Sequence, residues 1–263
     1  MTNIPVATQW IHQASPSYAQ QAIDSVAMVV TQSTGNKGTG WLAAERVIVT
    51  NEHVVRNGGP GNTVVRFPDG SVHAVAKIIA LDASLDLAAL ELQTTASCAP
   101  LKIDTTALIV GLQVYTLGFP LAYNGPAPLM CVGYVAGFEA RVLQAGAAPQ
   151  QRIVLNAALN PGNSGGPVLA WQESAVRGVA VSKHAPITSF LQSAIDALAN
   201  NQSGIVFTAT NGQGKTHTFV ESQLVADVLK YFRSMTQVVI GEAIPASDVA
   251  SFLTANKISW TKA

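Results

Sequence analysis

A serine in a glycine-rich turn is the residue of this sequence best suited to nucleophilic chemistry. Ser164 stands in NPGNSGGP, at residues 160–167. Its small neighbours leave room for another backbone, and they let successive backbone N–H groups point into one concavity that can hold an oxyanion. The N–H groups of Gly162 and Ser164 are the natural donors. The alternative is a plain glycine-rich turn without chemistry.

A serine hydroxyl is a weak nucleophile at neutral pH, so Ser164 needs a base. The sequence has 5 histidines, and His53 has the most suitable setting, in TNEHVV after an apolar run at residues 47–50. His12 lies in a polar N-terminal segment and His73 on a strand that we expect to be exposed. Both are therefore predicted to be surface histidines.

A histidine base works with a carboxylate that fixes its tautomer and stabilises the imidazolium. Asp86 lies between leucines in LDLAALEL, at residues 85–92. A carboxylate at the start of a buried strand is costly unless it has a partner, and a histidine would supply one. Asp82 is the alternative carboxylate, and we expect it to be a turn residue before the strand.

We expect β-strands to position these residues, and the strand patterns continue to about residue 185. Short β-branched runs bounded by Gly, Pro or Asn recur along this part, which favours an all-β barrel or sandwich. The runs lie at residues 26–31, 47–50, 63–67, 77–80, 87–92, 113–117, 153–155, 167–170 and 177–181. Helical periodicity of the apolar residues predicts helices at residues 187–199, 220–232 and 248–253.

The composition excludes several classes of protein. Of the 263 residues, 15 are Lys or Arg and 15 are Asp or Glu, and charged residues make up 11% of the chain. With 48% hydrophobic residues the chain is too apolar for a disordered protein, and with a net charge of +0 it does not fit a general nucleic-acid binder. The uncharged stretch at residues 105–138 is broken by prolines and glycines, so no membrane-spanning segment is expected.

The termini and the cysteines add two expectations. Cys98 and Cys131 allow one disulfide at most, and we expect both to be free thiols in the core. The N-terminal segment has no basic region followed by an apolar run, so no secretory signal is expected and a cytoplasmic location is predicted.

Together these segments resemble a known family. His53, Asp86 and Ser164 follow one another in the order of the chymotrypsin-type serine proteases. The motifs TNEHVV, LDLAALEL and NPGNSGGPVL most resemble those of the bacterial HtrA/Deg branch of the trypsin-like serine proteases. The similarity extends to residues 118–120, 133–141 and 240–246, and it is to the protease domain alone, without a PDZ domain.

The resemblance implies a fold and a division of the chain. The fold would be all-β, with two perpendicular six-stranded antiparallel β-barrels of the chymotrypsin type and the three candidate residues in the cleft between them. We expect an N-terminal segment at residues 1–24 and a first barrel at 25–100. A second barrel at 101–263 would carry a helical insertion at 187–236 and a closing C-terminal helix.

The activity that the resemblance implies is that of a serine endopeptidase. His53 would take the proton from Ser164, Asp86 would hold His53, and the N–H groups of Gly162, Asn163 and Ser164 would hold the oxyanion. An acyl-enzyme would form and water would release it, with no metal or organic cofactor. The alternative is a protease-like binding module with a latent active site.

The resemblance also implies a pocket for the P1 side chain, the residue before the scissile bond. Ala158 would form its base, and Val181, Ser182 and Lys183 its wall. Ala158 offers no carboxylate to an Arg or Lys side chain, which predicts a small or aliphatic P1 residue. If Lys183 points inward, an acidic P1 residue is favoured instead.

Expected partners follow from the same resemblance. They are protein or peptide substrates, with neither nucleic acid nor membrane. The family branch often trimerises through its N-terminal segment, which makes a homo-oligomer one alternative for this chain. Trp10, Ile11 and Tyr18 could serve that contact, and ordinary packing is the other alternative.

Two features depart from the family pattern. Asn163 replaces the aspartate that pairs with a newly cleaved N-terminus in digestive relatives, so no N-terminal proteolytic activation is expected. The insertion contains ATNGQGKT at residues 209–216, which fits a relaxed phosphate-binding loop. So short an insertion cannot supply the parallel sheet of a nucleotide-binding domain, and a turn or hairpin is predicted there instead.

Overall fold

The computed structural model describes residues 6–142, 149–181, 188–210, 212, 214–235 and 240–263. The chain divides into two compact units. Met1–Lys183 and Val239–Ala263 form one unit, and His184–Val238 form the other.

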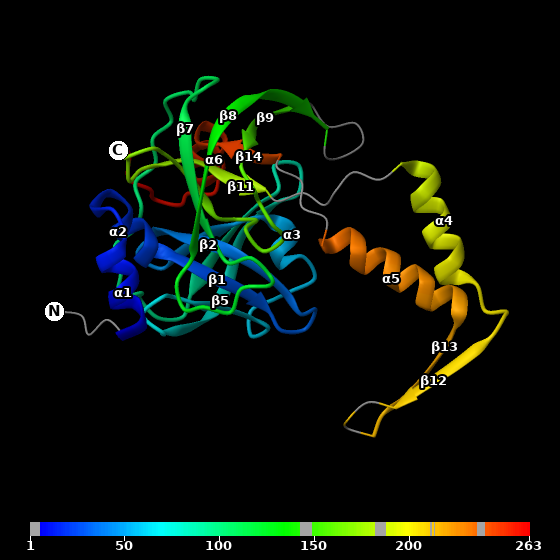
Figure 1. The fold of residues 1–263 in the computed structure, drawn as a ribbon. Coiled ribbons are helices and arrows are strands. Elements are labelled where there is room, and N and C mark those ends of the chain that lie inside the picture. Colours follow the sequence, from blue (N-terminus) through cyan, green and yellow to red (C-terminus); the bar gives the residue numbers. More distant parts are fainter. Residues whose placement is uncertain (1–5, 143–148, 182–187, 211, 213, 236–239) are drawn as a thin grey trace. The chain divides into compact units, whose positions relative to one another are not determined.

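The first half of the larger unit is a closed antiparallel barrel with the strand order β1-β2-β3-β6-β5-β4, drawn in blue to cyan in Figure 1. β1 closes the barrel because it pairs with β2 on one side and with β4 on the other. The β-branched residues that predicted strands here suit a pleated surface that packs against neighbouring strands. The strands are β1 (Val26–Thr31), β2 (Asn36–Ala44), β3 (Val47–Thr50), β4 (Thr63–Arg66), β5 (Val72–Asp82) and β6 (Leu87–Leu92).

The second half is another closed antiparallel barrel, with the order β10-β11-β14-β9-β8-β7. Its last strand, β14, follows the smaller unit in the sequence. It pairs with β11 on one side and with β9 on the other. Among the described residues each barrel has six strands, which confirms the expected all-β, chymotrypsin-like fold. The strands are β7 (Gln113–Gly118), β8 (Leu129–Arg141), β9 (Gln150–Asn156), β10 (Pro167–Ala170), β11 (Val176–Val181) and β14 (Gly241–Pro245).

A shared core joins the two barrels, and β6 illustrates it. Ala88 and Leu90 pack inside the first barrel. Leu87 and Ala89 belong to a second cluster, which also contains residues of the other barrel such as Tyr115. Because successive residues of a strand face opposite sides, β6 is buried on both faces, and its sequence is a continuous apolar run rather than an alternating one.

Helices cover the ends of this unit. The sequence predicted no helix near the N-terminus, and the structure has two there, α1 (Val6–Ala14) and α2 (Ser17–Ser25). Tyr18 of α2 packs edge-on against Tyr115 and Trp171, with ring centroids 5.6 and 5.7 Å away. Ile11 also packs against the shared core, whereas Trp10 is 70% exposed. Ile11 and Tyr18 therefore serve ordinary packing within the chain.

Two further helices complete the larger unit. α3 (Glu52–Val55) is a single turn between β3 and β4, and α6 (Ala246–Ala255) follows β14 directly. α6 is the predicted closing helix, and it buries Val249, Phe252 and Leu253 against the shared core.

The smaller unit contains α4 (Ser189–Asn200), a hairpin of β12 (Val206–Thr210) and β13 (Thr216–Val220), and α5 (Glu221–Met235). The two helices lie close to those that the periodicity predicted. The hairpin pairs Thr210 with Thr216 next to the turn. The candidate phosphate-binding segment is therefore followed by a strand and not by a helix, which confirms the predicted hairpin. Asn211 and Gln213 lie outside the described residues.

The two cysteines lie in different barrels, Cys98 after β6 and Cys131 in β8. Both cysteines carry free thiols and are half-buried, and burial raises the pKa of Cys98 to about 12. None of the helices in the described residues is long and apolar enough to cross a membrane.

Candidate active site

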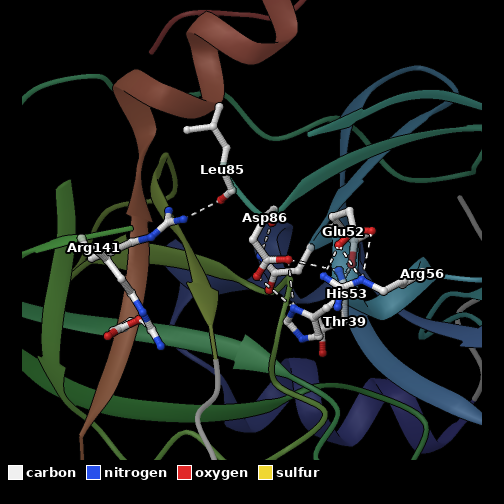
Figure 2. Close-up of polar contacts among 11 residues, drawn as sticks. Thr39, Glu52, His53, Arg56, Leu85, Asp86 and Arg141 are labelled. Atoms are coloured by element: carbon white, nitrogen blue, oxygen red, sulfur yellow. Dashed lines mark hydrogen bonds and ion pairs between the residues drawn. The ribbon is translucent and has the colours of Figure 1, made fainter. Parts of the chain in front are cut away.

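His53 and Asp86 lie in direct contact, facing each other in Figure 2. The ring Nδ1 of His53 is 3.0 Å from Oδ1 and 2.9 Å from Oδ2 of the carboxylate. The backbone N–H of His53 donates to Oδ1 as well, at 3.0 Å. The Asp86 side chain is 12% exposed, while the His53 side chain is 38% exposed. The buried carboxylate thus fixes the ring from one side, and the imidazole remains accessible to solvent.

The backbone around Asp86 has an unusual conformation that another side chain supports. Asp86 has a φ of 61°, in the left-handed region, where a non-glycine residue costs about 1–3 kcal/mol. Its carbonyl oxygen accepts a hydrogen bond from Nδ2 of the buried Asn51, at 2.8 Å. Asn51 is the residue before α3, so the chain that leads into the helix of the histidine is tied to the turn of the aspartate. The alternative carboxylate, Asp82, accepts the N–H groups of Ser84 and Leu85, at 2.8 and 2.9 Å, as predicted for a turn residue.

Thr39 of β2 holds the loop of Ser164 in place. Its N–H donates to the carbonyl of Ser164 at 2.8 Å, and its hydroxyl donates to the carbonyl of Gly162 at 2.7 Å. The same hydroxyl accepts the N–H of Phe119 at 2.9 Å, and the Thr39 carbonyl accepts the Thr50 hydroxyl at 2.7 Å. Sequence reasoning missed Thr39. Its one sequence signal is a polar residue between two glycines, immediately before the apolar run at residues 41–44.

The serine loop lies against the segment that leads to His53. Gly165 has a φ of +88°, and a Cβ there would lie 2.4 Å from the Thr50 hydroxyl and 3.0 Å from the N atom of Asn51. Asn51 is two residues before His53 in the chain. The fold therefore brings the turn that contains Ser164 against the segment that leads to His53, although the two are far apart in the sequence. Ser164 itself is 3% exposed.

The peptide between Pro161 and Gly162 has a defined orientation. The Pro161 carbonyl accepts the N–H of Leu121 at 2.8 Å. The C=O and N–H of a trans peptide point in opposite directions, so the Gly162 N–H points away from Leu121. Gly162 has a φ of +100°, and a Cβ there would lie 2.4 Å from the carbonyl oxygen of Phe119. This position therefore requires glycine.

Asn163 does not fit the role expected of it. Its N–H donates to the carbonyl oxygen of Asn160 at 3.0 Å. Because that N–H is engaged within the turn, it is not available to an oxyanion. Of the three expected donors, Asn163 is therefore withdrawn, and the N–H groups of Gly162 and Ser164 stay predictions.

The structure describes only part of the predicted P1 pocket. Ala158 is half-buried, between β9 and β10, and its carbonyl lies 3.5 Å from Sγ of Cys131. Val181 is half-buried and is the last residue of β11, where it pairs with Glu242. Ser182 and Lys183 lie outside the described residues.

His12 and His73 lie apart from this site. His12 pairs with Asp24 at 2.6 Å and is partly buried. His73 was predicted to be at the surface, and this is wrong. It is buried, its ring nitrogens contact the hydroxyls of Thr94 at 2.7 Å and Ser71 at 3.0 Å, and it packs edge-on against Phe67. Two hydroxyl partners remove the cost of burying an imidazole, so His73 is a structural residue.

Lys37 is a further residue that sequence reasoning missed. Its ammonium group donates to the carbonyls of Pro120 at 3.0 Å and Tyr123 at 2.6 Å, and partial burial lowers its pKa. These two carbonyls flank Leu121, which orients the Gly162 peptide. Lys37 therefore ties the first barrel to the loop that supports the serine turn. Among the described residues, no cluster of His, Cys, Asp and Glu could hold a metal ion.

Comparisons with known proteins show the family to which the chain belongs. Residues 38–179 match the family model described as trypsin-like peptidase domain. The serine protease PepD of Mycobacterium tuberculosis is 31% identical over 164 residues, which cover 56% of this chain and 34% of that protein. The chain thus spans about a third of that relative's length.

Solved structures share the fold. The active form of the Rv3671c protease of M. tuberculosis superposes with a TM-score of 0.61 at 16% identity, over 94% of this chain and 87% of that one. An HtrA-type protease solved with a tripeptide gives a TM-score of 0.60 at 16% identity, over 90% of this chain and 62% of that one. The predicted resemblance to the HtrA/Deg branch is confirmed. With more than half of its residues matched by the family model, the chain belongs to the trypsin-like peptidase domain family.

Proposed function

We propose that the chain is a serine endopeptidase with Ser164 as nucleophile, His53 as general base and Asp86 as the carboxylate that orients the base. The observation that carries the proposal is the contact of His53 Nδ1 with both oxygens of the buried Asp86, at 3.0 and 2.9 Å. This contact leaves Nε2 as the ring nitrogen that receives a proton. It also stabilises the imidazolium that forms when the proton arrives.

The reaction would proceed in two steps. His53 takes the proton of the Ser164 hydroxyl as its oxygen attacks the peptide carbonyl, and it then gives the proton to the leaving amine. Water hydrolyses the resulting acyl-enzyme by the same route in reverse. The N–H groups of Gly162 and Ser164 are the proposed donors to the oxyanion, and the orientation of the Pro161 carbonyl toward Leu121 supports the role of Gly162.

The substrate is proposed to be a protein or peptide with a small or aliphatic P1 residue. Ala158 supports this preference because it carries no charge at the expected base of the pocket. No residue from 153 to 172, the stretch that contains both Ala158 and Ser164, is charged. A buried Arg or Lys side chain without a partner there would be strongly destabilised.

We do not expect the enzyme to be activated by a newly cleaved N-terminus. Asn163 is buried and neutral, so it offers no carboxylate to an α-amino group. The serine turn is instead held by Thr39 and by the Leu121 N–H, both within the chain.

A fluorophosphonate probe and a panel of peptides test the proposal. We expect the probe to label wild-type protein and not Ser164→Ala, and peptides with Val or Ala at P1 to be cleaved faster than those with Arg, Lys or Glu. Ser251→Ala is a matched control, because this exposed serine on α6 donates to a carbonyl of its own helix, that of Ser247, at 2.8 Å. If the folded wild-type protein is neither labelled nor active on any peptide, the latent binding module is the better description. Faster cleavage after Arg or Lys would overturn the proposed pocket.

A further inference from the structure

A buried arginine lies behind the candidate active site. Arg152 belongs to β9 of the second barrel and is 1% exposed. Its neighbours in the strand, Ile153 and Leu155, are core residues. Burial lowers the pKa of its guanidinium, and its Nη1 has no hydrogen-bond partner within the described residues. A buried charge with an unsatisfied N–H group is unfavourable for stability, so packing alone does not account for this side chain.

A hydrogen bond from Arg152 reaches the other barrel. Its Nη2 donates to the carbonyl of Leu85 at 2.7 Å, and the dashed line at Leu85 in Figure 2 marks this bond. Leu85 lies in the turn between β5 and β6, immediately before Asp86. The N–H of Leu85 is held as well, by the Asp82 carboxylate at 2.9 Å. Both ends of Leu85 are therefore fixed by charged groups, one from each barrel.

This arrangement acts on the peptide that leads into Asp86. With its φ of 61°, Asp86 is in a conformation that the surrounding contacts must hold. The Leu85 carbonyl is part of that peptide. The hydrogen bond from the Arg152 guanidinium therefore fixes the orientation of the peptide plane immediately before Asp86, and with it the direction of the Asp86 side chain. Asn51 holds the following peptide through the Asp86 carbonyl, at 2.8 Å. Loss of either contact would free one side of the turn.

Charge adds to the effect of geometry. The negative charges of Asp86 and Asp248 stabilise the protonated Arg152, and Arg141 opposes it. The attraction is mutual, so it also draws the Asp86 side chain toward Arg152. An apolar side chain of similar length would supply neither the hydrogen bond nor this attraction.

We propose that Arg152 is a positioning residue for the reaction, which holds the turn before Asp86 so that the carboxylate meets both Nδ1 and the backbone N–H of His53. The inference rests on the proposed function. It adds a contact between the barrels that is outside the three residues expected to take part in the chemistry.

The test replaces Arg152 by Met, which has a similar length and no charge, and by Lys, which keeps the charge and one donor. We expect Arg152→Met to lower kcat on the order of 10²-fold with KM little changed, because a displacement of about 1 Å in a reacting group has such an effect. Arg152→Lys should recover part of the loss. Arg46→Met is the matched control, since Arg46 also donates to a backbone carbonyl, that of Leu92 at 2.9 Å, at the far end of β6.

A second readout does not depend on activity. The proton between His53 Nδ1 and Asp86 should give a far-downfield proton NMR signal in the wild-type protein, and we expect this signal to shift or broaden in folded Arg152→Met and not in Arg46→Met. If Arg152→Met folds poorly, Asp82→Asn weakens the opposite end of Leu85 and should change the same signal.

Several outcomes would decide against the inference. An unchanged kcat and an unchanged signal in the folded variant would overturn it. Equal losses in Arg152→Met and Arg46→Met would also overturn it, because they would reflect stability alone. A wild-type protein that shows the signal but no hydrolysis would count against the proposed function, and the effect of Arg152→Met on the signal would still decide the inference.

Discussion

Replacing Gly162 by alanine tests the oxyanion site most directly. The added Cβ would lie 2.4 Å from the Phe119 carbonyl oxygen and 2.7 Å from the N atom of Leu121. Both atoms are backbone, so neither can move aside as a flexible side chain would. The φ of +100° adds strain of about 1–3 kcal/mol for a residue with a Cβ. The loop would relieve the clash and the strain by shifting the peptide between Pro161 and Gly162, whose carbonyl accepts the Leu121 N–H.

The functional consequence is the loss or displacement of one oxyanion donor. Removing one such donor lowers kcat by roughly 10²–10³-fold, or about 3–4 kcal/mol of transition-state stabilisation. We expect KM to change little, because the donor acts on a charge that develops only in the transition state. Steady-state kinetics with a P1 valine peptide measure both values, and thermal unfolding measures the cost of strain separately.

Gly59→Ala is the matched control for this substitution. A Cβ on Gly59 meets no atom within 4 Å, so that variant should retain wild-type kcat and stability. Gly162→Ala that is folded and keeps a wild-type kcat would refute the assigned direction of the Gly162 N–H. A rise in KM with an unchanged kcat would refute it too, because it would indicate a loss of ground-state binding.

Three other substitutions have defined outcomes. Thr39→Val leaves the buried carbonyl and N–H that its hydroxyl contacts without a partner, and it should lower the free energy of unfolding by about 2–4 kcal/mol in urea titrations, whereas Thr39→Ser should be close to wild type. Lys37→Met removes two charged hydrogen bonds from residues 120–123, and we expect kcat to fall on the order of tenfold, with a lower Tm, since such bonds contribute about 1.5–3 kcal/mol. The pKa of Asp104 is lowered from 3.8, first by the hydrogen bond from the Thr106 N–H, so its contribution to stability is present above that pH and is lost as the pH falls below it. Asp104→Asn should therefore be less stable than wild type at neutral pH, and urea titrations should show the difference shrinking toward about pH 3, whereas a difference independent of pH would contradict this assignment.

Local sequence patterns predicted the strands that carry the site because those strands are short, β-branched and bounded by turn residues. They also predicted the role of Asp82, since an aspartate before a serine in a turn binds nearby N–H groups regardless of the rest of the fold. The burial of His73 could not be predicted in this way. Ser71 and Phe67 are near His73 in the chain, but Thr94 follows β6, and no local pattern records that its hydroxyl meets the ring.

The N-terminal helices were missed for a related reason. Each is only 9 residues long, and Tyr18 of α2 packs on Tyr115 and Trp171 of the second barrel. Helices of this length depend on such tertiary packing more than on propensity. The engagement of the Asn163 N–H by Asn160 also depends on the conformation of the closed turn, which glycine content alone does not specify.

By itself the sequence determined the class of fold and the order of His53, Asp86 and Ser164, because residue type, spacing and apolar periodicity are local properties. The tertiary structure decided how these residues are held. The hydroxyl of Thr39, the ammonium of Lys37 and the guanidinium of Arg152 each bind backbone groups more than sixty residues away in the chain. Hydrogen bonds over such separations exist only after the two barrels have closed and packed on their shared core.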